Sequence, residues 1–186
     1  MLPILIVAID PVDVSAMSPL TRRLSKIFSS GVELTSVKPL DGSFAFNFSR
    51  NQYGSTPLLS ALLDKYKSYE GKILGVTSGD LFVPVLTYVF GEAQLDGKAA
   101  VVSSHRLSEE FYGLQPDRDL FALRLLKESA HELGHTFGLL HCRNYLCAMH
   151  SSTGVEEIDL KTDRFCGDCS DKLRQGGGQE SFSNQH

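Results

Sequence analysis

The apolar residues of the first thirty positions change their spacing once, from the pattern of a strand to that of a helix. Residues 2–9 form an unbroken aliphatic run, which predicts a strand buried on both faces of a sheet. After Pro19 the apolar residues recur at helical spacing as far as Phe28, and Gly31 is the expected cap of that helix.

The next segments continue these two patterns. Alternation predicts strands at 32–40 and, after the turn signal Asp41-Gly42, at 43–48. Thr56 and Pro57 predict the N-cap and first turn of a second helix. Its apolar face consists of Leu58, Leu59, Leu62, Leu63 and Tyr66.

Three more strands are expected between residues 71 and 103. Residues 71–77 and 99–103 predict core strands, and residues 83–90 predict an edge strand because Pro84 cannot donate to a central ladder. Residues 91–97 are expected to form a loop or a short hairpin. The repeated order of strand, helix and strand predicts an α/β fold with helices packed against the sheet.

Composition and charge narrow the class of protein. The 186 residues are 42% apolar and 22% charged, which fits one globular domain. The net charge of −4 counts against a nucleic-acid partner, and the lack of an apolar run of about 18 residues counts against a membrane span. The N-terminus lacks the features of a signal peptide, so we expect a cytoplasmic protein. We also expect a monomer.

Residues 131–142 read HELGHTFGLLHC and carry the clearest chemistry. On a helix, His131 and His135 lie one turn apart on one face, so both imidazoles can meet one metal ion. Gly138 permits a sharp left-handed turn that would return His141 as a third ligand. Three imidazoles leave a tetrahedral zinc one position for water, and Glu132 is the expected general base for that water.

The extended motif, followed by Cys142, Cys147, Met149, Cys166 and Cys169, resembles the archaemetzincin family of zinc peptidases. The resemblance is densest over residues 77–169. It implies that His131, His135 and His141 are catalytic zinc ligands, that Glu132 is the general base, and that Met149 forms a Met-turn beneath the metal.

The four cysteines form two closely spaced pairs. Cys142 and Cys147 are separated by four residues, and Cys166 and Cys169 by two. Both spacings suit a closed four-thiolate zinc site, which would fix the floor of the catalytic site. Two disulfides and a redox-active Cys166/Cys169 pair are the alternatives.

Substrate binding is expected at an edge strand over 88–94, with Tyr88, Phe90 and Glu92 as candidate residues. An extended peptide can add to such an edge through main-chain hydrogen bonds, although the segment can equally be a simple sheet edge. Glu92 could meet the amino terminus of a substrate, which would favour aminopeptidase action.

The sequence therefore predicts an α/β, metzincin-like domain over residues 1–174, with a twisted mixed sheet and packed helices. It divides into residues 1–138, which end in the active-site helix, and a small zinc-tied part at 139–174; residues 175–186 are expected to be a flexible tail. The predicted function is a zinc metallopeptidase with two zinc ions and a peptide or protein substrate. A zinc-stabilised peptide-binding protein with little turnover, or a zinc-ribbon interaction protein, is the alternative.

Overall fold

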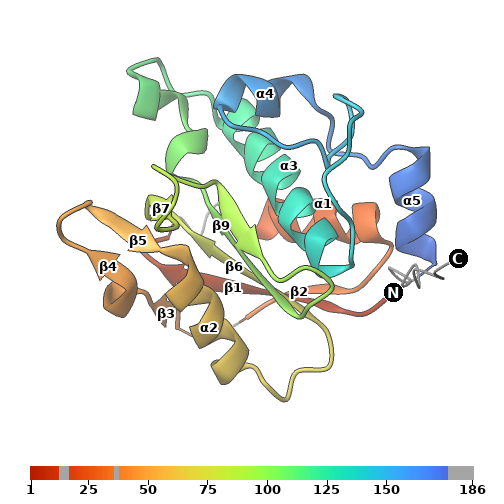
Figure 1. Ribbon diagram of the computed structural model, residues 1–186, viewed down its shortest axis with the longest axis horizontal. Coiled ribbons are helices and arrows are strands. Elements are labelled where there is room, and N and C mark those ends of the chain that lie inside the picture. Colours follow the sequence, from red (N-terminus) through yellow and green to blue (C-terminus); the bar gives the residue numbers. More distant parts are fainter. Residues whose placement is uncertain (13–16, 36–37, 176–186) are drawn as a thin grey trace, which may run out of the picture.

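A twisted mixed sheet with helices on both faces forms the body of the protein (Figure 1), and the computed structural model describes residues 1–12, 17–35 and 38–175. Within these ranges the main sheet has six strands. In order they are β2 (Val32–Leu34), β1 (Ile4–Asp10), β6 (Lys72–Thr77), β9 (Ala99–Ser103) and β8 (Gly91–Ala93), with β3 (Leu40–Asp41) beside the end of β1. Neighbouring strands are parallel except β8, which runs antiparallel to β9 at the edge.

Both faces of the sheet are buried because β1 alternates between two hydrophobic clusters. Ile4 and Ile6 join the cluster that includes α1 (Met17–Phe28) and α3 (Arg118–Thr136). Leu5 and Val7 join the cluster that includes α2 (Ser55–Lys65). Successive strand residues face opposite sides, so α1 and α3 cover one face and α2 covers the other. This arrangement confirms the predicted α/β class.

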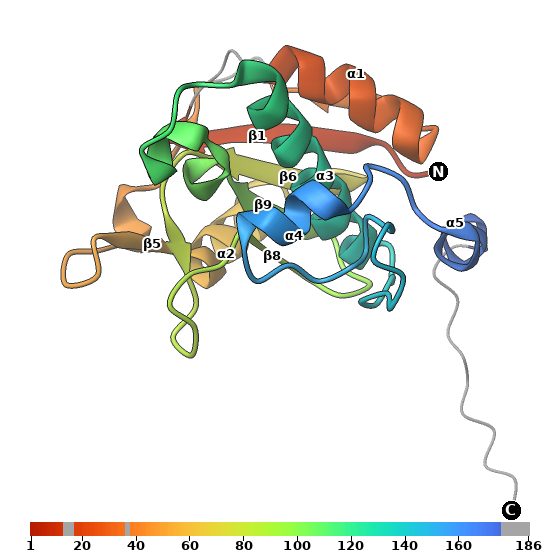
Figure 2. The same cartoon turned by 90° about the horizontal axis from the view of Figure 1, so that it is seen from above.

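The remaining elements are short. A second sheet contains β4 (Phe46–Asn47), β5 (Gln52–Gly54) and β7 (Leu81–Phe82). Two short helices, α4 (Val155–Leu160) and α5 (Gly167–Arg174), follow α3, and Figure 2 shows α5 beside the N-terminus. Apart from Gln175, the segment expected to be a tail lies outside the described residues. None of the helices in the described ranges has the length and apolar character needed to cross a membrane.

Several predicted element boundaries are wrong. The left-handed residue after α1 is Ser29, with φ 48°, rather than Gly31. The N-cap of α2 is Gly54 rather than Thr56. The expected strand over 32–40 is two separate short strands, β2 and β3, with residues 36–37 outside the described ranges.

A turn replaces the first half of the strand predicted over 43–48, of which only β4 remains, and all of the strand predicted over 83–90. Residues Ser43–Ala45 form a 3-10 helix, because the Asp41 carboxylate accepts a hydrogen bond from the Ser43 N–H at 2.9 Å and favours a local turn. Residues 83–90 form no strand: the Leu86 N–H donates to the Val83 carbonyl at 3.1 Å in a turn that contains Pro84. This segment links β7 to β8 and leaves the Val85 side chain 88% exposed.

Candidate active site and metal centres

The helix α3 presents His131, Glu132 and His135 from its last two turns. Asp117 caps the helix, because its carboxylate accepts hydrogen bonds from the N–H groups of Asp119 at 3.0 Å and Leu120 at 2.9 Å. The helix is almost wholly buried from Arg124 to Gly134. Packing on all sides therefore fixes the position of the motif, as a precise metal site requires.

Gly138 turns the chain back at the end of α3. Its φ of 84° is in the left-handed region, and its N–H donates to the His135 carbonyl at 2.9 Å. The Leu139 N–H donates to the Gly134 carbonyl at 3.0 Å, which completes a Schellman motif. The turn brings His141 back to the helix, as the sequence predicted.

The three histidines offer nitrogens that lie within 4.8 Å of one another. The Nε2 atoms of His131 and His135 are 3.1 Å apart. Their Nδ1 atoms are held by the carbonyls of Ala148, at 2.8 Å, and Leu139, at 2.7 Å. Metal-binding histidines are commonly oriented in this way, so the arrangement fits a zinc ion facing the Nε2 atoms.

Burial favours the neutral imidazoles that a metal needs. It lowers the pKa of His131 well below the ordinary value of 6.5, and the nearby Lys161 ammonium lowers it further. Burial also lowers the pKa of His135. Both side chains therefore remain unprotonated and able to bind a metal near neutral pH.

Glu132 is buried directly beneath the edge strand β8. A Cβ atom at Gly91 would lie 2.6 Å from the Glu132 Cγ, so only glycine permits this close approach. Burial raises the pKa of the Glu132 carboxyl well above its ordinary value of 4.5, and the Glu128 carboxylate raises it further. Gly91 was not among the predicted site residues, because no pattern in the sequence marks it.

Met149 packs against α3, the helix that carries His131 and His135. Its side chain is fully buried, and its sulfur packs against the backbone of α3 at Gly134. The Met149 carbonyl accepts a hydrogen bond from the Cys142 N–H at 2.9 Å, which ties this residue to the segment after His141. Met149 thus packs against the helix that carries His131 and His135, and its assignment as a Met-turn residue stays a prediction.

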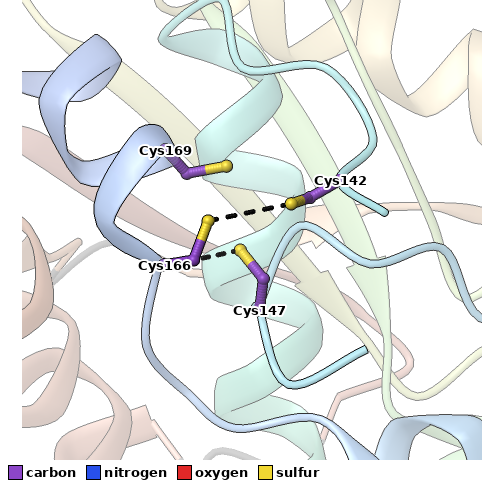
Figure 3. A group of neighbouring side chains, drawn as sticks. All are labelled: Cys142, Cys147, Cys166 and Cys169. Carbon is purple, nitrogen blue, oxygen red and sulfur yellow. Dashed lines mark hydrogen bonds between the residues drawn. The ribbon is translucent and has the colours of Figure 1, made fainter. Parts of the chain in front are cut away.

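The four cysteines converge in a second cluster, with all four sulfurs within 4.8 Å of one another (Figure 3). All are free thiols, and the sulfurs of Cys142 and Cys166 are 3.7 Å apart. Tetrahedral zinc with bonds of about 2.3 Å places its sulfurs about 3.8 Å apart, so the separation fits a zinc ion. The disulfide alternative is therefore wrong for this structure, in which no cysteine pair is bonded.

A cleft of about 380 Å³ opens beside the histidines. One wall, here called the β8 wall, consists of residues 86–91, and the opposite wall, here called the Thr153 wall, consists of residues 151–153. Tyr88 and Phe90 line the cleft, and their role in substrate binding stays a prediction. Glu92 is not among the lining residues. Its carboxylate instead accepts hydrogen bonds from Ser55, at 2.5 Å, and Thr56, at 2.9 Å, so it contacts α2 where a substrate contact was expected.

An ion pair that the sequence analysis did not identify lies at the base of the cleft. The Lys161 Nζ is 2.7 Å from the Glu128 Oε1, and the two side chains are 0% and 4% exposed. Lys161 also donates to the His150 carbonyl at 3.1 Å. The four-residue spacing of Glu128 and Glu132 was the available signal, since it places both carboxylates on one face of α3.

The chain matches known proteins over most of its length. The model of the family described as "Peptidase family M54" matches residues 26–175. An archaemetzincin of Methanocaldococcus jannaschii is 46% identical over 134 residues, which cover 72% of this chain and 73% of that protein.

Solved structures give the same result. The zinc-dependent peptidase of Methanocorpusculum labreanum is 34% identical, with a TM-score of 0.81, over 91% of this chain and 99% of that one. The archaemetzincin of Methanopyrus kandleri is 34% identical, with a TM-score of 0.80, over 94% of each chain.

Proposed function

Because this chain belongs to peptidase family M54, together with the archaemetzincins, and is a zinc metallopeptidase by that membership, we propose that it hydrolyses peptide bonds in the cleft between β8 and α3. In this proposal His131, His135 and His141 hold the catalytic zinc and Glu132 is the general base. The observation that carries it is the position of Glu132, buried between the histidine cluster and the edge of β8.

Zinc, when bound by three imidazoles, supplies a Lewis acid that polarises a carbonyl and lowers the pKa of water. The converging Nε2 atoms and the neutral state of His131 and His135 support this assignment. The chain's own contribution is to hold the ligands rigidly, through the carbonyls of Ala148 and Leu139.

Glu132 takes and returns the proton. Its raised pKa supports a carboxylate that accepts a proton from water and then gives it to the leaving amine near neutral pH. Its burial beside β8 keeps the carboxylate away from bulk water, which strengthens its interactions with the reacting groups.

The edge of β8 is suited to hold an extended peptide. Phe90 accepts a hydrogen bond from the Ser103 N–H at 2.8 Å, and Gln94 donates to the Ala99 carbonyl at 3.0 Å. Alternate residues of an antiparallel ladder bond to the partner strand, so the intervening Gly91 and Ala93 present their N–H and C=O groups to the open edge. A substrate that pairs there lies directly over Glu132.

A second zinc ion at the four cysteines completes the proposal. The separation of 3.7 Å between the Cys142 and Cys166 sulfurs supports a closed, structural site. It would tie the segment after His141 to α5 and so support Met149 from below. The aminopeptidase preference rested on Glu92, and we do not retain it because Ser55 and Thr56 engage that carboxylate.

Zinc content and hydrolysis, measured together, test this function. We expect two zinc ions in the parent chain and one in both His131→Ala and Cys166→Ser. Glu132→Ala should keep two zinc ions and lose at least a hundredfold in hydrolysis of a degenerate peptide library. Parent-like hydrolysis by Glu132→Ala would contradict the general base, and a peptide that binds tightly without being cleaved by the parent would indicate a binding protein.

A further inference from the structure

A side chain bridges the two walls of the catalytic cleft. The Tyr88 hydroxyl, from the β8 wall, donates a hydrogen bond to the Thr153 carbonyl of the Thr153 wall at 2.6 Å. Both residues line the cleft that contains His131 and Glu132. The bridge therefore bounds the cleft on one side of the reacting groups, at the N-terminal end of β8.

Contacts at its base hold the Tyr88 ring in place. The Arg106 guanidinium lies 4.0 Å from the centre of the ring. Asp80 fixes Arg106 through two hydrogen bonds of 2.7 Å, a bidentate geometry that restricts the guanidinium in both direction and rotation. The tyrosine is thus preorganised across the cleft.

The residue before Tyr88 is also anchored. The Thr87 carbonyl accepts hydrogen bonds from Gln52 Nε2 and from Arg50 Nη2, each at 3.0 Å. Gln52 in turn donates to Asp80 at 2.8 Å, so the same carboxylate supports the ring and the backbone. Three contacts therefore hold Tyr88 and Thr87 on their own side of the cleft, whereas a single hydrogen bond joins Tyr88 to Thr153 on the other side.

The direction of a bound peptide decides which part of it meets the bridge. Antiparallel pairing is the more stable ladder, and a peptide that pairs antiparallel with β8 has its carboxyl-terminal side toward residues before Gly91. Tyr88 lies on that side. Only three chain positions separate Tyr88 from Gly91, which lies over Glu132, and three extended residues span at most about 10 Å.

We propose that Tyr88 determines substrate length by closing the carboxyl-terminal side of the cleft. In this inference, which rests on the proposed peptidase function, no more than about three residues follow the cleaved bond. The substrate class is then the carboxyl-terminal ends of peptides. Loss of the bridge should open the cleft to internal bonds.

Cleavage positions in a degenerate library of free 14-residue peptides, mapped by mass spectrometry on the zinc-loaded full chain, test this inference. We expect the parent to cut within about three residues of the carboxyl terminus. Tyr88→Phe keeps the ring over Arg106 and removes only the hydrogen bond. It should raise the ratio of internal to terminal cleavage at least tenfold.

Tyr69→Phe is the matched control, because it removes a tyrosine hydroxyl at a residue that packs in the α2 cluster. Its cleavage map should equal that of the parent. Internal or amino-terminal cleavage by the parent, or an unchanged map in Tyr88→Phe, would overturn the inference while leaving the peptidase function intact. If the zinc-loaded parent cleaves no peptide, the proposed function fails and this inference fails with it.

Discussion

The sulfur of Met149 packs directly onto the backbone of α3 at Gly134, one residue before His135. A Cβ atom at position 134 would come closer to that sulfur than real Cβ atoms do. Helix propensity alone would favour alanine over glycine here by about 1 kcal/mol. The glycine is therefore explained by the close packing of Met149 beneath the active-site helix.

Gly134→Ala should destabilise the protein despite the better helix former. Overpacking of a buried site costs about 1–3 kcal/mol, which exceeds the gain in propensity. Thermal unfolding of the zinc-loaded protein should show a lower Tm. Gly31→Ala is the control, because a Cβ there meets nothing within 4 Å and should leave the Tm unchanged. A raised Tm in Gly134→Ala would contradict the packing of Met149.

Gly91→Ala should reduce catalysis without loss of metal. The added Cβ would lie 2.6 Å from Cγ and 2.7 Å from Oε1 of Glu132, so the carboxylate must move away from the reacting groups. Small displacements of catalytic groups are costly, and we expect kcat/KM to fall at least tenfold, or about 1.4 kcal/mol in the barrier. Unchanged zinc content, measured by mass spectrometry of metals, would separate this effect from loss of a ligand; an unchanged kcat/KM would contradict it.

The local parts of the site could be predicted from the sequence. His131, Glu132 and His135 share one helix, so their spacing alone fixes which side chains meet. The Gly138 turn adds His141 through one left-handed residue, whose φ is 84°. The cysteine cluster was also predictable, because the short spacing within each cysteine pair indicates metal ligands regardless of the structure of the segment between the pairs.

Long-range contacts set the conformation of residues 83–90 and the position of the Glu92 side chain, which the sequence did not predict. Residues 83–90 are apolar, as a strand would be, yet Arg50 and Gln52 hold the carbonyl of Thr87 and keep the segment as a loop. Glu92 turns to α2 because Ser55 and Thr56 offer two hydroxyl donors there. In both cases the bonding partners lie more than thirty residues apart in the sequence, so no local periodicity could predict the contact.

Lys161→Met should be strongly destabilising, because it leaves the Glu128 carboxylate buried without its partner. Breaking a buried ion pair from one side costs about 3–5 kcal/mol. The double variant Lys161→Met/Glu128→Gln should recover a large part of this loss, since the unpaired charge is gone. Denaturant unfolding measures both, with the exposed Lys65→Met as a control within about 0.5 kcal/mol of the parent. Additive losses in the double variant would contradict the pairing.

Asp80→Asn should lower the free energy of unfolding at neutral pH, and this loss should shrink in acid. Burial raises the pKa of Asp80, yet hydrogen bonds from Arg106 and Gln52 outweigh it and hold the pKa below 3.8. A lowered pKa contributes stability above the ordinary value and loses it as pH falls through the folded value. The stability difference from the parent should therefore be about 2 kcal/mol at pH 7 and shrink below pH 3.8. Denaturant unfolding at both pH values, with the exposed Asp64→Asn as control, measures it; a difference independent of pH would show that Asp80 acts without its charge.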